Sequence, residues 1–324
     1  MKIGTFLTAL TAALLLGAAP LAAQDHAEPV TAAAPSSAQA DAEHADEKYD
    51  IITPHITDGN HMEVPWILPP FFKEVTLPHW EPIHVGPLTI DLSPTKHVIF
   101  LMLGAVLLIA IMILVANAHV RATQAGQAPK GGTNAIEAMI LYIRNEVILP
   151  NVGHHGEGFV PYLLTVFFFI LTLNLLGLVP YGSTATGNIS VTATLAVMTF
   201  ITVEIAGIRA NGWGYLNTIF YWNNELPLLM RPLMFLIMSP VEMIGKLTKP
   251  FALAIRLFAN MTAGHIVVLA FMGLFFTFLL PIGIAPLAMA VAIMLLELFV
   301  AFLQAFIFTL LSSVFIGQIR EAHH

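Results

Sequence analysis

Long runs of apolar residues, separated by short polar segments, make up most of the chain after its first third. Three runs, at 98–116, 159–179 and 189–208, hold about 20 residues each, which is the length of helix that crosses a hydrocarbon core about 30 Å thick. A fourth apolar region, 226–319, is far longer and is interrupted by "PIGIAP". Because this region is long enough for two helices joined by a turn, the pattern predicts five membrane crossings.

The last apolar segment is too long to stand upright in a bilayer. From 287 to 319 it holds about 33 residues, or about 50 Å of helix, against a hydrocarbon core of about 30 Å. We therefore expect an all-α integral membrane protein whose last two helices are long and either tilt steeply or extend well beyond the membrane.

An amphipathic segment follows the first crossing. In "NAIEAMILYIRNEVIL", Ile136, Ile140, Ile143 and Val147 fall on one helical face. The segment predicts a helix on the inner membrane surface, in addition to the five crossings. An ordinary packing helix fits the same pattern equally well.

The first 95 residues differ from the remainder of the chain. The start, "MKIGTFLTALTAALLLGAAPLAAQ", has one lysine, a short apolar core and a small-residue end, which predicts a signal peptide at 1–23. A short first membrane helix is the alternative, but the apolar run is short for a crossing. Residues 24–95 are acidic and then rich in Pro and aromatic residues, and we expect an irregular external segment there. The membrane domain is then 96–324.

Composition supports this division and excludes several classes of protein. The chain is 57% hydrophobic and 10% charged and has no cysteine, as expected for a membrane protein without disulfides or thiol chemistry. Scattered basic residues offer no nucleic-acid surface. The sequence has no phosphate-binding loop and no dinucleotide fingerprint, and His154 and His155 are better explained as a polar loop than as metal ligands. We expect no cofactor, no metal and no catalysis by this chain alone.

Basic residues predict the orientation. Arg121, Lys130 and Arg144 follow the first crossing, Arg209 follows the third and Arg320 lies near the C-terminus, whereas "YGSTATGN" between the second and third crossings has no charge. Since loops rich in Lys and Arg stay in the cytoplasm, the N-terminus should lie outside and the C-terminus inside. The location that fits is a bacterial inner membrane.

One arginine stands deep inside the long apolar region. Arg256 cannot lose its charge, and its placement at a bilayer centre costs about 2.5 to 3.5 kcal/mol, so we expect a functional role. Snorkelling to the surface suits this position poorly because it is far from both helix ends. Glu242, Lys249 and Asn260 share roughly the same helical face. Lys246 and Lys249 are most simply explained as anchors at the inner membrane interface.

The last two helices should form an antiparallel hairpin, in which facing residues have numbers with a nearly constant sum. His265 with Glu297 and Arg256 with Gln304 give nearly the same sum. The first pair would lie toward the outside, the second near the middle, and Glu242 toward the inside. A histidine facing a carboxylate beside a buried arginine is typical of a proton path. A hydrogen-bonded core histidine is the alternative for His265, and interhelical hydrogen bonds are the alternative for the amides.

On these residues the chain resembles subunit a of the F-type ATP synthases. "FALAIRLFANMTAGH" and "ELFVAFLQAFIFTLL" resemble the two signature helices of that family, and "PYLLTVFFFILTLNLLGLVP", "TGNISVTATLA" and "PVEMIGKLTKPFALAIRL" match it as well. The likeness covers about residues 96–320. It implies a non-catalytic, proton-translocating stator subunit whose partners are the ring of subunit c (the c-ring), subunit b of the peripheral stalk and the rest of the complex.

The resemblance also implies roles for individual residues. The stator arginine of the family falls on Arg256, its partner amides on Asn260 and Gln304, and its inner-side acid on Glu242. Protons would enter from outside, neutralise a c-ring carboxylate and leave near Glu242, while Arg256 prevents a continuous proton wire. The ring carboxylates would choose the coupling ion, proton or sodium.

The chain departs from the family pattern at three positions. Many members carry Glu where His265 stands and His where Glu297 stands, and the exchange keeps the same two groups together. Gly177 stands where some members have an acid. Two other classes stay open: a secondary cation/proton exchanger, for which no inverted repeat is evident, and a structural membrane anchor, which leaves Arg256 unexplained.

Overall fold

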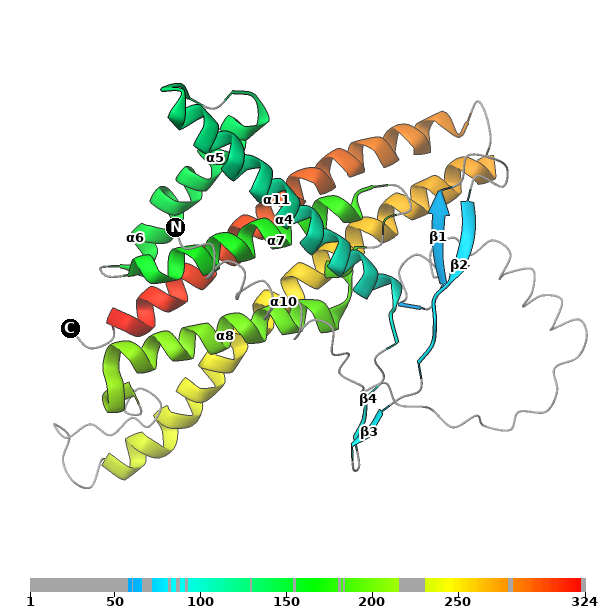
Figure 1. Ribbon diagram of the computed structural model, residues 1–324. Coiled ribbons are helices and arrows are strands. Elements are labelled where there is room, and N and C mark those ends of the chain that lie inside the picture. Colours follow the sequence, from blue (N-terminus) through cyan, green and yellow to red (C-terminus); the bar gives the residue numbers. More distant parts are fainter. Residues whose placement is uncertain are drawn as a thin grey trace, which may run out of the picture.

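Figure 1 shows the computed structural model of the chain. The structure describes residues 58–59, 61–65, 72–80, 83–85, 88–90, 93–128, 130–153, 156–179, 182, 184–215, 231–278 and 282–321. The predicted signal peptide at 1–23 and the paired histidines at 154–155 lie outside the described residues, so those two predictions remain predictions.

Five of the described helices are long and apolar enough to cross a membrane, as the sequence predicted. They are α4 (Lys96–Gln124), α7 (Val160–Gly177), α8 (Ile189–Asn211), α10 (Arg231–Phe278) and α11 (Ile284–Glu321). The last two run side by side in opposite directions and are far longer than the others (Figure 1). With 48 and 38 residues, they measure about 72 and 57 Å, so neither fits upright in a hydrocarbon core of about 30 Å.

The amphipathic segment after α4 is helical but not uniform. It forms α5 (Gly132–Tyr142), a π-helical stretch η1 (Ile143–Ile148) and a last short turn α6 (Leu149–Val152). None of the side chains of α5 is fully buried, whereas Ile143, Val147 and Ile148 belong to the core of the protein. The packing interpretation is therefore confirmed for η1, whereas the location of α5 on the inner membrane surface stays a prediction.

The residues described before α4 include two short hairpins. Strand β1 (His61–Pro65) pairs antiparallel with β2 (Phe72–Thr76), and β3 (Ile83–Val85) pairs with β4 (Leu88–Ile90). The expectation of an irregular segment was wrong for these residues. The many Pro residues led to the prediction of irregular structure, although short strands can still form when their hydrogen bonds stay within one hairpin. The membrane-spanning part remains all-α.

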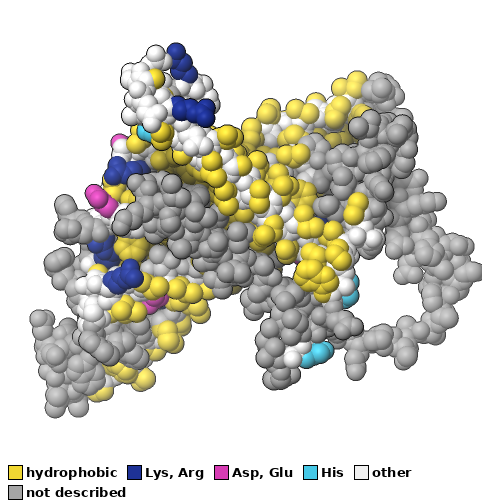
Figure 2. Space-filling view, viewed as in Figure 1, with side chains coloured by type: hydrophobic (Ala, Val, Ile, Leu, Met, Phe, Trp, Pro, Cys, Tyr) yellow, Lys and Arg dark blue, Asp and Glu magenta, His cyan; other side chains and the backbone are white. Residues whose placement is uncertain are grey.

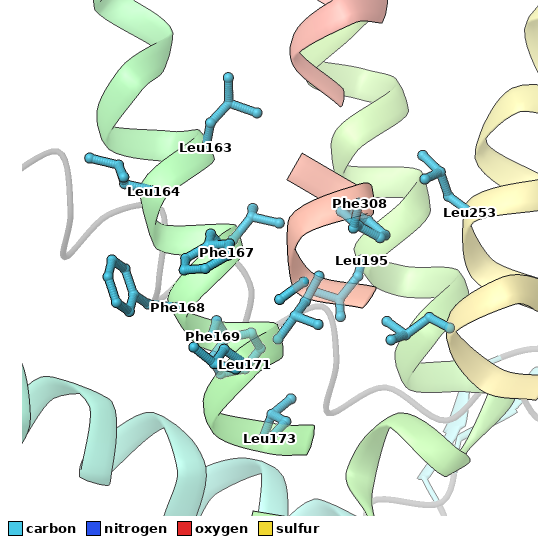
Figure 3. Packing of buried hydrophobic residues seen from close by; sticks show 14 of the residues in the cluster. Leu163, Leu164, Phe167, Phe168, Phe169, Leu171, Leu173, Leu195, Leu253 and Phe308 are labelled. Atoms are coloured by element: carbon cyan, nitrogen blue, oxygen red, sulfur yellow. The ribbon is translucent and has the colours of Figure 1, made fainter. Parts of the chain in front are cut away.

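The core centres on α7, which packs against α4 and α11. Leu163, Phe167, Phe169 and Leu173 of α7 lie among buried side chains of neighbouring helices, as Figure 3 shows. Two thirds of the apolar stretch of α7 is buried, against 6% for α10. Within the described part of the chain, α10 therefore leaves most of its surface for lipid or a partner.

In the described connections between the crossings there are three short 3-10 turns. They are η2 (Gly156–Phe159) before α7, η3 (Ala185–Gly187) before α8 and η4 (Gly212–Tyr215) after α8. The turn η3 matters most here, because it joins the end of α7 to the start of α8 and contacts α4, α7 and α10. It therefore closes the end of the bundle at which α4 begins.

Candidate functional site

His265 and Glu297 form a buried pair between α10 and α11. The Nδ1 atom of His265 lies 2.8 Å from Oε1 of Glu297, and the two side chains are 20% and 5% exposed. This confirms the predicted contact. On the other side of the ring, Nε2 lies 3.0 Å from the Gly177 carbonyl oxygen and 2.9 Å from Oγ1 of Thr184. All four residues meet where α7 ends and η3 begins.

These contacts determine how the pair can hold protons. The Gly177 carbonyl can only accept a hydrogen bond, so Nε2 of His265 carries a proton and donates it there. The remaining nitrogen, Nδ1, then shares one further proton with the carboxylate of Glu297, either as neutral imidazole beside a carboxylic acid or as imidazolium beside a carboxylate. Such a pair can take up a proton on one side and pass it on from the other.

Two glycines make room for this cluster. A Cβ on Gly264 would lie 2.8 Å from Oε1 of Glu297, and a Cβ on Gly177 would collide with the side chain of Thr184. Because neither position has a side chain, α10 and α7 approach the carboxylate and the hydroxyl closely. The departure at Gly177 is thus explained by packing, since an acid at that position would displace Thr184.

Hydrogen bonds of Asn174 support the cluster around His265. Asn174 is fully buried, and its Nδ2 donates to the Ala301 carbonyl of α11 at 3.3 Å, while its Oδ1 accepts from the hydroxyl of Thr186 at 2.7 Å. Buried amides and hydroxyls with their hydrogen bonds satisfied hold helices in one register. The bracing fixes η3 relative to α7 and α11.

The remaining predicted residues occupy different surroundings. Arg256 is half-buried, Asn260 and Glu242 are exposed, and Gln304 is buried. Among the described residues, Arg256 makes no ion pair and no side-chain hydrogen bond with this chain's own groups. The structure therefore does not lock the guanidinium to a carboxylate of the described residues. The pairing of Arg256 with Gln304 stays a prediction.

A cavity of about 250 Å³ opens at the other end of α8. It lies between α8, α10 and α11, and four charged residues line it: Glu204, Glu242, Lys246 and Lys249. Along α10, Arg256 lies about 10 Å beyond Lys249 and about 14 Å before His265 at 1.5 Å per residue. The arginine thus stands between two separate polar regions.

Two of the cavity residues, Glu204 and Lys246, belong to a network around Tyr215. Its hydroxyl donates to Oε2 of Glu204 and accepts from Nζ of Lys246 at 2.8 Å, and Nζ lies 3.8 Å from Oε1 of Glu204. Burial and then the bond to Glu204 raise the pKa of the Tyr215 hydroxyl above its ordinary value. The phenol therefore stays protonated and keeps donating.

The network gives Lys246 partners within the protein. Lys246 is only 13% exposed and is held by Tyr215 and Glu204, whereas its place at the inner membrane interface stays a prediction. Lys249 is exposed, and its Nζ lies 3.4 Å from Oε1 of Gln318. Sequence reasoning missed Glu204 as a cavity residue and Tyr215 as its partner, because both contact Lys246, which is distant in the chain.

The sequence is similar to proteins of one known family. The family model described as ATP synthase A chain matches residues 98–317. The chain is 47% identical over 277 residues to "ATP synthase subunit a" of Chloroherpeton thalassium, covering 85% of this chain and 78% of that protein. It is 46% identical over 309 residues to "ATP synthase subunit a 2" of Chlorobaculum tepidum, covering 92% and 82%.

A further relative matches almost the whole length of both proteins. "ATP synthase subunit a 2" of Chlorobium luteolum is 42% identical over 347 residues, covering 98% of this chain and 95% of that protein. The family model spans more than half of the chain, and all three relatives cover more than two thirds of it. The chain therefore belongs to the ATP synthase A chain family.

Proposed function

We propose that the His265–Glu297 pair and the cavity around Glu242 are the two half-channels of a proton path, with Arg256 between them. As a member of its family, the chain is the proton-translocating, non-catalytic stator subunit of an F-type ATP synthase. It is a multi-pass protein of a bacterial inner membrane and works with the c-ring. The exchanger alternative is not favoured by this membership.

The outer half-channel rests on the proton-sharing pair. His265 receives a proton at Nδ1 while Nε2 stays bonded to Gly177, and Glu297 can accept that proton because its carboxylate is 2.8 Å away. From there the proton reaches a carboxylate on the c-ring. Asn260, exposed on α10 between the pair and Arg256, would line this route.

Arg256 supplies the fixed charge between the half-channels. A permanent cation in a region of low dielectric attracts a carboxylate and repels protons. Since Arg256 makes no ion pair among the described residues, its negative partner is best supplied by the moving ring. The ionised ring carboxylate would pass the guanidinium, and Gln304 from α11 would assist at the same depth.

The inner half-channel is the charged cavity. Glu242 and Glu204 provide acceptors for the proton released by the ring, and Lys246 and Lys249 line the same cavity. A membrane potential contributes about 2.3 kcal/mol per charge per 100 mV to the complete transfer. The direction of rotation follows because uptake and release take place on opposite sides of Arg256.

Orientation and the outer segment are part of the proposal. The Lys and Arg side chains visible in Figure 2 gather at the end of the bundle where α4 ends, which supports a cytoplasmic location for that end. The C-terminus of α11 would then be cytoplasmic and residues 24–95 external, after removal of a signal peptide at 1–23. Subunit b is proposed as a further partner on the family resemblance.

The guanidinium of Arg256, which has no ion pair with any described residue, is the observation that carries this proposal. The test is proton-driven ATP synthesis by purified complex in vesicles, with Arg256→Ala compared against Arg121→Ala, an exposed arginine at the end of α4. Arg256→Ala should abolish synthesis and Arg121→Ala should leave it near normal. Unchanged synthesis by Arg256→Ala would refute the assignment.

A further inference from the structure

A carboxylate from the external segment joins two helices at the outer end of the bundle. Oδ1 of Asp58 lies 2.7 Å from Nδ1 of His97 at the start of α4, and Oδ2 accepts from Nδ2 of Asn188 at 3.0 Å. The neighbouring Gly59 carbonyl accepts from the backbone N–H of Lys96 at 3.2 Å. Asp58 therefore ties the segment before the first crossing to both α4 and α8.

The contact between Asp58 and His97 is shielded from water, mostly on the side of the histidine. His97 is 3% exposed, and Asp58 is partly shielded from water. Burial raises the pKa of the Asp58 carboxyl, but the hydrogen bond and charge of His97 outweigh it and leave that pKa below its ordinary value. The carboxylate is thus ionised and available to both partners under working conditions.

Asn188 belongs to the loop that holds His265. In residues 184–188, Thr184 contacts Nε2 of His265, Thr186 donates to Asn174, and the Gly187 carbonyl lies 3.5 Å from the hydroxyl of Thr262. The amide of Asn188 closes the loop by capping α8, since its Oδ1 accepts from the Ser190 N–H at 2.9 Å.

Nearly every polar group of this loop is therefore bonded to a different part of the protein. Within the described part of the chain, only the bond from Asn188 leads to the external segment. If that bond is lost, the loop is held at its His265 end but loses its support at the α8 end. A shift of the loop would move Thr184 relative to His265, and small misplacements in a proton-transfer geometry have large effects on rate.

We infer that Asp58 is a positioning residue for proton uptake: through Asn188 it fixes the loop 184–188, and the loop fixes His265 against Glu297. The inference deepens the proposed function and rests on it. It gives the segment before α4 a role, which is to brace the outer half-channel. Asp58 does not touch the transferred proton and acts only through the loop.

An exchange of the two side chains tests the inference. Asp58→Asn keeps an acceptor for His97 but sets an amide NH₂ against the NH₂ of Asn188, so only the second bond is lost. Adding Asn188→Asp restores an amide-to-carboxylate bond in the reverse direction and still provides a cap for α8. Glu157→Ala, which removes an exposed acid at the other end of the bundle, is the matched control.

The measurements are ATP synthesis in vesicles and the outer pH that gives half-maximal synthesis. Asp58→Asn should lower the rate about tenfold and shift the outer pH midpoint, the double variant should recover to within about twofold of wild type, and Glu157→Ala should change neither. The inference is overturned if Asp58→Asn behaves as wild type or if the double variant recovers nothing.

Assembly is measured in parallel by co-purification with the c-ring. If Asp58→Asn fails to assemble, the double variant decides alone: recovered assembly and synthesis support the inference, and failure of both overturns it. Arg256→Ala is run beside these variants. Loss of synthesis in Arg256→Ala with wild-type behaviour of Asp58→Asn removes only the present inference, whereas normal synthesis in Arg256→Ala removes the proposed function.

Discussion

Gly264 leaves the space on α10 that the Glu297 carboxylate occupies. A Cβ at this position would lie 2.8 Å from Oε1 and 2.9 Å from Cδ of Glu297, and ordinary van der Waals contact begins at 3.4 Å. In Gly264→Ala the carboxylate must therefore move by about 0.6 Å. It can do so, because it is the end of a flexible side chain, and the variant should fold.

The movement of the Glu297 carboxylate in Gly264→Ala weakens its hydrogen bond to His265. A displacement of that size along the bond would lengthen the 2.8 Å contact to about 3.4 Å, beyond the range of a good hydrogen bond. Hydrogen bonds to charged groups contribute about 1.5–3 kcal/mol, which corresponds to a loss of about ten- to a hundredfold in the paired geometry. The gain in helix propensity from Gly to Ala, about 1 kcal/mol, works in favour of assembly and does not restore the pair.

Proton-driven ATP synthesis in vesicles measures the effect, with co-purification of the c-ring as the check on assembly. We expect Gly264→Ala to assemble normally and to synthesise ATP at least about tenfold more slowly than wild type. Gly273→Ala in the same helix is the matched control, since no atom lies within 4 Å of its Cβ position. Equal rates for the two variants would show that the His265–Glu297 contact does not limit proton uptake.

Two further predictions concern stability. Gly317→Ala should destabilise the protein by about 1–3 kcal/mol and reduce the yield of assembled complex, because its Cβ would collide with the backbone carbonyl of Asn151, whereas Gly245→Ala, which meets no atom within 4 Å, should not. Because the pKa of the Tyr215 hydroxyl is raised in the folded protein, this hydroxyl loses its proton at a lower pH in the unfolded chain than in the folded chain. Its contribution to the free energy of unfolding should therefore be fully present below about pH 10 and decrease above it. Thermal unfolding between pH 9 and 11 should show a smaller alkaline loss in Tyr215→Phe, and an unchanged loss would contradict the raised pKa.

Much of the membrane architecture could be predicted because the lipid environment restricts it. A helix is the only open structure that satisfies its own backbone in hydrocarbon, so apolar length alone indicates each crossing. The contact between His265 and Glu297 was also predictable, since an antiparallel hairpin fixes which residues face each other. That argument needs only the position of the turn between α10 and α11.

The remaining parts of the site depend on contacts between elements that are distant in the sequence. Thr184 and the Gly177 carbonyl reach His265 from another helix and a connecting turn, and nothing in their local pattern indicates a hydrogen bond to an imidazole. The same holds for Tyr215, which joins Glu204 and Lys246 across two helices. Local hydrophobic periodicity carries no information on such contacts.

The central claim is that a fixed positive charge keeps two half-channels apart. The most direct measurement is passive proton flux across vesicles that contain the assembled complex, driven by a pH gradient without ATP turnover. With the guanidinium removed in Arg256→Ala, the region between the Glu242 cavity and the His265–Glu297 pair loses its barrier to protons, so flux should rise well above that of wild type while synthesis stops. Flux as low as that of wild type, together with sustained synthesis, would contradict the account.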